Sequence, residues 1–147
     1  MQYLYLILAF LCGAIYPIQG SLNSKLLGQV GHPIITAIIS FLAGLIGLLI
    51  LGIVNKIPWN QFLEVKNTPW YALTGGLLGA FYVATVVIIL PRLGMVLTFS
   101  LIIAGQIILS IIIDHFGLLG NAVKEITLGK SIGILMLIIS IIIIRKF

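Results

Sequence analysis

The sequence predicts an all-α, polytopic membrane protein, and three observations lead to that fold class. Hydrophobic residues make up 61% of the 147 residues, whereas charged residues make up only 7%, far below the proportion of about a quarter in soluble domains. The mean hydropathy is +1.29. The apolar residues also gather in runs close to the ~20 residues that a spanning helix needs. A water-soluble fold of this size could not bury so much apolar side chain.

Five spanning segments are expected, at about 2–27, 34–54, 70–90, 93–113 and 129–144. The first two are separated by Gly31-His32-Pro33, a combination typical of a break between helices. The second ends where the polar stretch 55–69 begins. Because no water is available inside a bilayer to pair with the backbone, this spacing favours a helical bundle over a barrel.

The remaining segments are bounded by similar signals. The third begins at Trp70, which with Trp59 suits the aromatic belt at a membrane interface. Pro91-Arg92-Leu93-Gly94 predicts a tight turn before the fourth segment, and 114–130 is the expected last loop. The fifth is short, so its terminal basic residues are expected to snorkel to the interface. All five form a single transmembrane domain over 1–147.

Small residues in the spans predict close helix packing. Gly75 and Gly79 form a GxxxG pair, and Ser40 with Gly44 forms a small-xxx-small pair. Such pairs pack helices either within one chain or between two chains. Five helices can hardly surround a solute, so association with a second chain is expected.

The basic residues show no bias between the two sides of the membrane. With five spans, one side receives Lys56, Lys66, Lys124 and Lys130, and the other receives Lys25, Arg92, Arg145 and Lys146. Because Lys and Arg in loops set orientation, equal numbers suggest dual topology and an antiparallel homodimer. The alternative is that a partner protein or one strong local signal sets the orientation. No run of basic residues suggests a nucleic-acid partner.

The first segment carries polar residues on one helical face. Cys12, Tyr16, Gln19 and Asn23 follow at spacings of four, three and four, which places them on the same side of a helix. Pro17 removes a backbone N–H and is expected to kink the helix. This face is a candidate wall of a substrate pathway. The alternative is a helix end near water, where Gln19 and Asn23 are simply solvated.

Other spans add candidates to this pathway. They are Ser40 in the second segment, Tyr82 in the third, and Gln106 and Ser110 in the fourth. An unpaired amide at mid-span is costly in hydrocarbon, so Gln106 is expected to face other helices or a wet cavity. Asp114 and His115 follow at the end of that segment, either as groups reaching headgroups and water or as a gate or proton-responsive pair.

The residues absent from the spans limit the chemistry. No Asp or Glu lies at the centre of a span, and no Lys or Arg is placed to grip a buried anion. A lining of amides, hydroxyls and phenols suits a neutral, zwitterionic or amphipathic solute. No HExxH, GxSxG or phosphate-binding glycine loop is present, so neither an enzyme nor a bound cofactor or metal is expected.

Several motifs, in order along the chain, resemble a small bacterial membrane family, the YdcZ-type proteins of the drug/metabolite transporter (DMT) superfamily. These motifs are Tyr16-Pro17-Ile18-Gln19-Gly20-Ser21-Leu22-Asn23, Pro69-Trp70, the stretch from Gly75 to Val83, Pro91-x-x-Gly94, Gly105-Gln106, and Asp114-His115-Phe116-Gly117. The resemblance covers essentially the whole chain. Family members occur as single units, as adjacent pairs and as fused doubles.

The resemblance implies a multi-pass protein of the bacterial inner membrane, equivalent to half of a ten-helix, inverted-repeat transporter. It singles out Pro17, Gln19, Asn23, Gly105, Gln106, Asp114 and His115. It names no substrate. Together with the polar residues of the spans, it leads us to expect a secondary transporter, an exporter of a small organic metabolite or drug-like solute by alternating access in a dimer. That dimer would be an antiparallel homodimer or a pair of homologous subunits in the lipid bilayer. The alternative is a non-transporting subunit that partners or orients another membrane protein. The membrane glutamate of the small multidrug-resistance branch has no counterpart in segment 2–27.

Overall fold

The computed structural model describes residues 2–147, and the regular structure in these residues is entirely helical. The long helices are α1 (Gln2–Val30), α2 (Pro33–Val54), α3 (Gly75–Leu93), α4 (Met95–Phe116) and α5 (Leu128–Lys146). Short 3₁₀ helices are η1 (Trp59–Asn67), η2 (Trp70–Thr74) and η3 (Leu118–Gly120). Within this range, five helical segments are long and apolar enough to cross a membrane. The predicted fold class is confirmed.

The break between α1 and α2 lies at the predicted position. Gly31 adopts a left-handed conformation with φ +77°, and Pro33 occupies the first turn of α2, where its missing N–H costs little. Helix α1 contains Pro17 and runs three residues further than predicted, for 29 residues in all. A helix of that length measures about 43 Å, longer than the ~30 Å hydrocarbon core.

The turn predicted over Pro91 to Gly94 is present but shorter than expected. Helix α3 continues through Pro91 and ends at Leu93, and the break falls on Gly94 alone, whose φ of +76° favours glycine. Pro91 has no N–H to donate to the carbonyl of Val87, so α3 lacks one hydrogen bond here and ends two residues later. The third span does begin at Trp70, but its first residues form the 3₁₀ helix η2 and the α-helix begins at Gly75.

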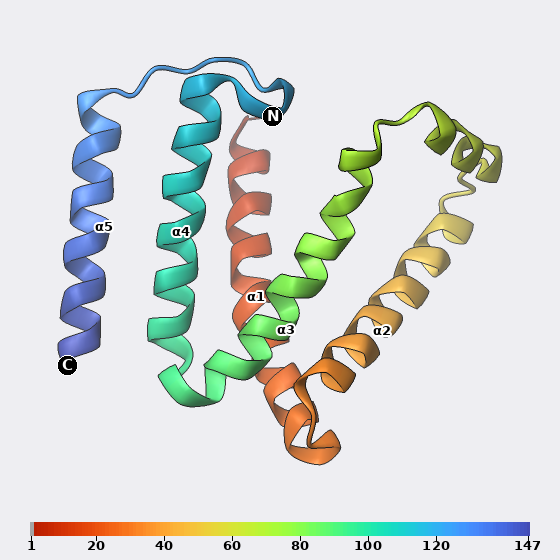
Figure 1. The fold of residues 1–147 in the computed structure, drawn as a ribbon, viewed down its shortest axis with the longest axis horizontal. Helices are drawn as coiled ribbons and strands as arrows, with labels where there is room; N and C mark the ends of the chain where they lie inside the picture. The colour runs from red at the N-terminus through yellow and green to blue at the C-terminus, as the bar shows by residue number, and fades with distance from the viewer. Residues whose placement is uncertain (1) are drawn as a thin grey trace. The chain divides into compact units, whose positions relative to one another are not determined.

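The chain divides into two compact units, Met1–Arg92 and Leu93–Phe147. In the first unit α1 packs on α2, and a small core joins Ala37 of α2 to Val83 and Val87 of α3. Helices α2 and α3 approach each other near this core and diverge toward η1 (Figure 1). In the second unit α4 packs on α5.

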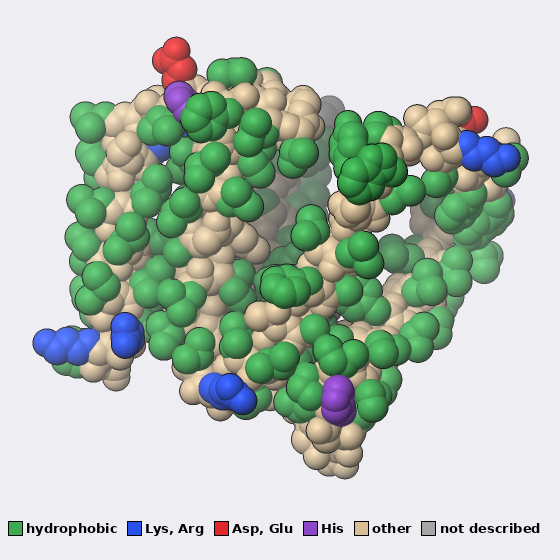
Figure 2. Space-filling model, in the orientation of Figure 1, with side chains coloured by type: hydrophobic (Ala, Val, Ile, Leu, Met, Phe, Trp, Pro, Cys, Tyr) green, Lys and Arg blue, Asp and Glu red, His purple; other side chains and the backbone are tan. Residues whose placement is uncertain are grey.

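The helices expose most of their large apolar side chains. Helix α5 has no buried residue, and α1 has only Gly20 and Asn23. Figure 2 shows hydrophobic side chains along the helices, with charged side chains near the helix ends. Such a surface suits lipid tails, which are as apolar as the side chains themselves.

The loop after α4 folds back onto the end of that helix. Gly117 ends α4 in a left-handed conformation with φ +60°. The backbone N–H of Lys124 donates to the carbonyl oxygen of Asp114 at 2.8 Å. A Cβ atom on Gly117 would lie 2.8 Å from Cγ2 of Val123 and 3.3 Å from the carbonyl oxygen of Asn121. Glycine is therefore required for both the backbone conformation and the close approach of the loop.

We expect Gly117→Ala to open this loop and to speed tryptic cleavage after Lys124 on the order of tenfold, because it adds left-handed strain and a steric clash. Gly120→Ala is the matched control: Gly120 also has a positive φ, of +82°, but a Cβ atom there would meet no heavy atom within 4 Å. Equal cleavage rates in the two variants would show that the contact with Val123 does not hold the loop.

Two threonines with completely buried side chains differ in their hydrogen bonding. Thr36 and Thr98 are both 0% exposed. The Thr36 hydroxyl donates to the carbonyl oxygen of His32 at 3.1 Å, whereas the Thr98 hydroxyl has no partner among the described residues. A buried polar group without a partner lowers stability, and a satisfied one adds to it.

Replacement by valine, which has nearly the same shape, should therefore act in opposite directions at these two positions. We expect Thr98→Val to raise the free energy of unfolding by about 1 kcal/mol and Thr36→Val to lower it by about 1 kcal/mol. Both can be measured by unfolding in mixed micelles, followed by circular dichroism. Destabilisation by Thr98→Val comparable to that by Thr36→Val would mean that the Thr98 hydroxyl is bonded in the membrane.

Candidate solute-binding site

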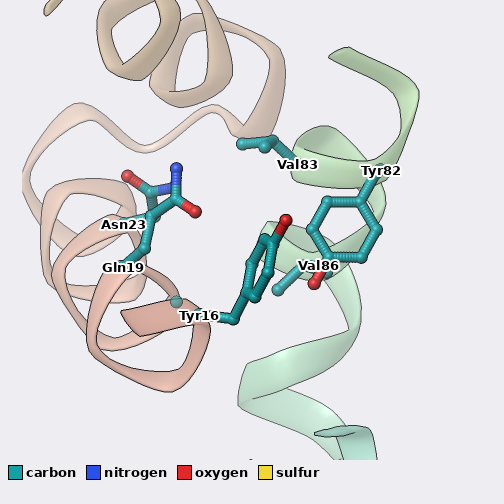
Figure 3. Close-up of a pocket in the computed structure, with 7 residues that line it drawn as sticks. Tyr16, Gln19, Asn23, Tyr82, Val83 and Val86 are labelled. Carbon is teal, nitrogen blue, oxygen red and sulfur yellow. The ribbon is translucent and has the colours of Figure 1, made fainter. Parts of the chain in front are cut away.

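A small polar pocket lies between α1 and α3 in the first unit. Its polar side chains are Tyr16, Gln19 and Asn23 from α1 and Tyr82 from α3. Gly20, Val83 and Val86 complete the lining. The cavity measures about 10 Å³, room for about one water molecule. Figure 3 shows the amide groups of Gln19 and Asn23 on one side of the Tyr16 ring and the Tyr82 ring on its other side.

Helical spacing explains why these side chains converge. Gln19 and Asn23 stand three and seven residues after Tyr16, so all three project from one face of α1. Tyr82 and Val86 are four residues apart and share a face of α3. Cys12, predicted to share the α1 face, is exposed and does not line the pocket.

The two tyrosine rings close one side of the pocket. Their centroids are 5.8 Å apart and their planes meet at 80°, an edge-to-face arrangement that aromatic pairs favour. Tyr16 remains 44% exposed. None of the lining residues is charged at neutral pH. The pocket can therefore donate and accept hydrogen bonds but supplies no full charge.

Asn23 is the most enclosed polar residue of the pocket. It is 7% exposed, and its side chain makes no hydrogen bond to another residue in the range 2–147. Its amide therefore depends on whatever occupies the cavity. This finding favours the pathway interpretation of Asn23 over that of an amide solvated at a helix end.

The first unit also contains two grooves, one of which adjoins this pocket. One, of about 300 Å³, runs along α2 and shares Gln19 with the pocket; its other lining residues are Ser40, Phe41, Gly44, Leu45 and Leu48. The other, of about 460 Å³, is almost wholly apolar and lies between α2 and α3, where it is lined by Ile34, Ala37, Ile38, Phe41, Ala80, Phe81 and Ala84. Phe41 borders both grooves.

Sequence reasoning missed the apolar part of this lining. Val83 and Val86 border the pocket, and Phe41, Leu45 and Leu48 border the groove. The spacing of four from Ser40 to Gly44 and on to Leu48 was a usable signal for the groove. In a helix that is apolar on every side, the sequence alone does not distinguish the apolar residues that line a groove from those that face lipid.

The predicted pathway residues of α4 lie in the second unit, outside the pocket and both grooves. Gln106 and Ser110 are exposed, and no hydrogen bond of the Gln106 side chain is found in the described part of the chain. The amide of Gln106 is thus left unpartnered by α5, the helix that α4 packs against.

The glycines predicted to pack helices differ in their surroundings. A Cβ atom on Gly79 would lie 3.5 Å from Cζ of Phe41, so this glycine lets α3 approach α2. A Cβ atom on Gly44, Gly75 or Gly105 would meet no other heavy atom within 4 Å. These three have room for a solute, a lipid or another chain.

Asp114 and His115 stand at the end of α4. The Asp114 carboxylate lies 3.8 Å from Nζ of Lys124, a partly exposed pair that contributes about 0–1 kcal/mol. The His115 ring contacts the Phe116 ring at 5.0 Å between centroids. Asp114 thus anchors the following loop by its backbone and its side chain. The gate role of this pair stays a prediction.

Comparison with known proteins places the chain in a family. A family model described as "Putative inner membrane exporter, YdcZ" matches residues 4–143. Neither a curated protein nor a solved structure matches the chain. The match covers nearly the whole length and all the spans, and it agrees with the family suggested by the motifs. The chain is therefore a multi-pass inner-membrane protein and belongs to the YdcZ family.

Proposed function

We propose that this chain is a secondary transporter that exports a small organic solute by alternating access, with two five-helix chains forming the transport unit. The observation that carries the proposal is the uncharged polar pocket between α1 and α3. Polar side chains are costly inside a membrane and usually mark a substrate path. The description of the family as an inner-membrane exporter supports export as the direction of transport.

The lining of the pocket suggests how a solute is held. Gln19 and Asn23 supply amide donors and acceptors, and the phenols of Tyr16 and Tyr82 supply hydroxyls. As a solute leaves the water on one side of the membrane, it exchanges its hydrogen bonds to water for hydrogen bonds to these groups. Separation of the Tyr16 and Tyr82 rings would then widen the pocket from the size of one water to the size of a solute.

The surface of the chain supports a second copy. The pocket between α1 and α3 has room for about one water molecule, and α5 buries none of its residues. Gln106 stands next to the midpoint of α4, exposed and unpartnered by α5. Because an unpaired amide is costly in hydrocarbon, we infer that a second chain covers this part of α4.

The equal distribution of basic residues supports an antiparallel arrangement of the two chains. Four Lys or Arg residues fall on each side of a five-span topology, so the positive-inside rule favours neither orientation. Two chains inserted in opposite orientations would form, by association, the inverted repeat that many transporters carry within one chain.

Transport by the purified chain alone is the first test. Liposomes containing the chain are loaded with a deproteinised bacterial metabolite extract, and mass spectrometry follows the solutes released. We expect at least one solute to leave faster through the wild-type chain, and Asn23→Leu to reduce that rate at least tenfold, because the leucine removes the enclosed amide without leaving a cavity.

Gln61→Leu is the matched control for this test. It also replaces an amide by leucine, but Gln61 lies in η1, where it is exposed and outside the pocket. Its release rate should equal that of the wild type. If no solute leaves faster than from empty liposomes, the chain is not a transporter by itself and the non-transporting subunit becomes the better account.

Disulfide crosslinking tests the antiparallel pair. In a Cys12→Ser background, Gln106→Cys should crosslink to its own copy, because mid-span residues of two antiparallel helices meet. Ile113→Cys should not, since it lies on the same helical face but two turns, or about 10 Å, nearer the helix end. Its two copies would be about 20 Å apart.

The crosslinking pattern also identifies the competing arrangements. Crosslinks at both positions would indicate a parallel dimer and would contradict the inverted repeat. No crosslink at either position would remove Gln106 from the interface between chains.

A further inference from the structure

The amide of Asn23 lines the cavity and is available to a hydrogen-bonding occupant. The residue is 7% exposed and its side chain has no partner within residues 2–147. A buried amide without a partner costs free energy, and the cavity that it lines holds about one water molecule. Whatever takes this position must be small where it meets Asn23 and must form hydrogen bonds.

The surroundings of Asn23 restrict the charge of that occupant. The nearby polar groups are the Gln19 amide and the hydroxyls of Tyr16 and Tyr82, each able both to donate and to accept. No acidic or basic side chain lines the cavity. A carboxylate or an ammonium placed there would lose its hydration without gaining a counter-charge, which is far costlier than burying a neutral group. A hydroxyl or a carboxamide fits.

Gln19 also shows where the rest of such a molecule would lie. Its side chain borders the pocket and the groove of about 300 Å³ along α2. Apart from Ser40, the groove residues beyond Gln19 are a glycine and large apolar side chains. At about 300 Å³, the groove has about thirty times the volume of the pocket. Its volume is that of a small solute and far less than that of a two-chain lipid.

We propose that the pocket at Asn23 and the groove at Gly44 form one binding site for an uncharged amphipathic solute. A hydroxyl or carboxamide group of the solute bonds to Asn23 and Gln19, and its apolar body lies along Gly44, Leu45 and Leu48. The inference rests on the proposed function and names the substrate class of that site. The substrate class is thereby limited to uncharged molecules, and zwitterions and ions are excluded.

Fluorine NMR tests the site without any transport. The chain contains five tyrosines, so 3-fluorotyrosine gives five signals, which single Tyr→Phe changes assign. The protein is placed in phosphatidylcholine nanodiscs and titrated with 2-phenylethanol, phenylacetamide, phenylacetate and phenethylamine. The four probes share one ring and differ in the polar group. The Tyr71 signal serves as the internal control, because Tyr71 lies in η2, outside the pocket.

We expect the alcohol and the amide to shift the Tyr16 and Tyr82 signals saturably, at concentrations at least tenfold lower than the carboxylate and the amine require. Equal responses to all four probes would overturn the proposal. So would shifts of all five signals without saturation, which indicate partition into the lipid. Shifts that follow the acyl-chain length of the nanodisc lipid, and not the probes, would assign the groove to lipid.

Matched glycine variants test the groove. Gly44→Leu should fill it and weaken binding at least tenfold. Gly47→Leu should leave binding unchanged, because Gly47 does not line the groove, and a Cβ atom on either glycine would meet no heavy atom within 4 Å. Asn23→Leu should also weaken binding at least tenfold. Unchanged binding in Gly44→Leu would overturn the proposal even if Asn23→Leu does not fold.

The binding and transport experiments separate the two proposals. Saturable binding of the neutral probes without solute release from liposomes would leave this site in place and remove the transporter function. Solute release that depends on Asn23, without preference for the neutral probes, would keep the transporter function and overturn the substrate class.

Discussion

The hydrocarbon interior of the membrane offers no hydrogen-bond partner, and this constraint accounts for most of what the structure shows. Backbone groups inside the membrane must be paired within the protein, and the helices pair most of them. Each polar side chain in a span must likewise find a partner or an occupant. Thr36 meets the requirement within its own helix turn. The side chain of Asn23 can find a hydrogen-bond partner in an occupant of the cavity. The side chain of Gln106 finds none on α5, the helix that packs against α4.

The first unit combines a polar pocket with an apolar groove, and Gln19 belongs to both. This combination suits a molecule with a polar group at one end. The tyrosine pair that closes the pocket is held by an aromatic contact rather than by a salt bridge, so opening it breaks no ion pair.

The second unit is organised by different interactions. The close approach of the loop to Gly117 and the hydrogen bond from Lys124 to the Asp114 carbonyl hold the 117–127 loop at the end of α4. At the start of α5, Thr127 accepts from the backbone N–H of Lys130, which caps the helix. These contacts restrict the course of the loop that joins α4 to α5. The apolar surfaces of the two helices would not by themselves fix how the helices align.

The sequence by itself determined the number and approximate position of the spans, because the length of an apolar run and the Gly and Pro residues between runs reflect bilayer thickness and backbone geometry. It also placed Tyr16, Gln19 and Asn23 on one face, since helical spacing requires it. It could not locate the break on Gly94 within the predicted 91–94 turn, because a proline removes one helical hydrogen bond but need not end the helix at once.

Only the tertiary structure brought Tyr82 of α3 to the polar face of α1. The physical reason is that these helices are apolar on almost every side. Their periodicity therefore does not tell which face meets a neighbour, and that is decided by side-chain contacts between residues distant in the sequence.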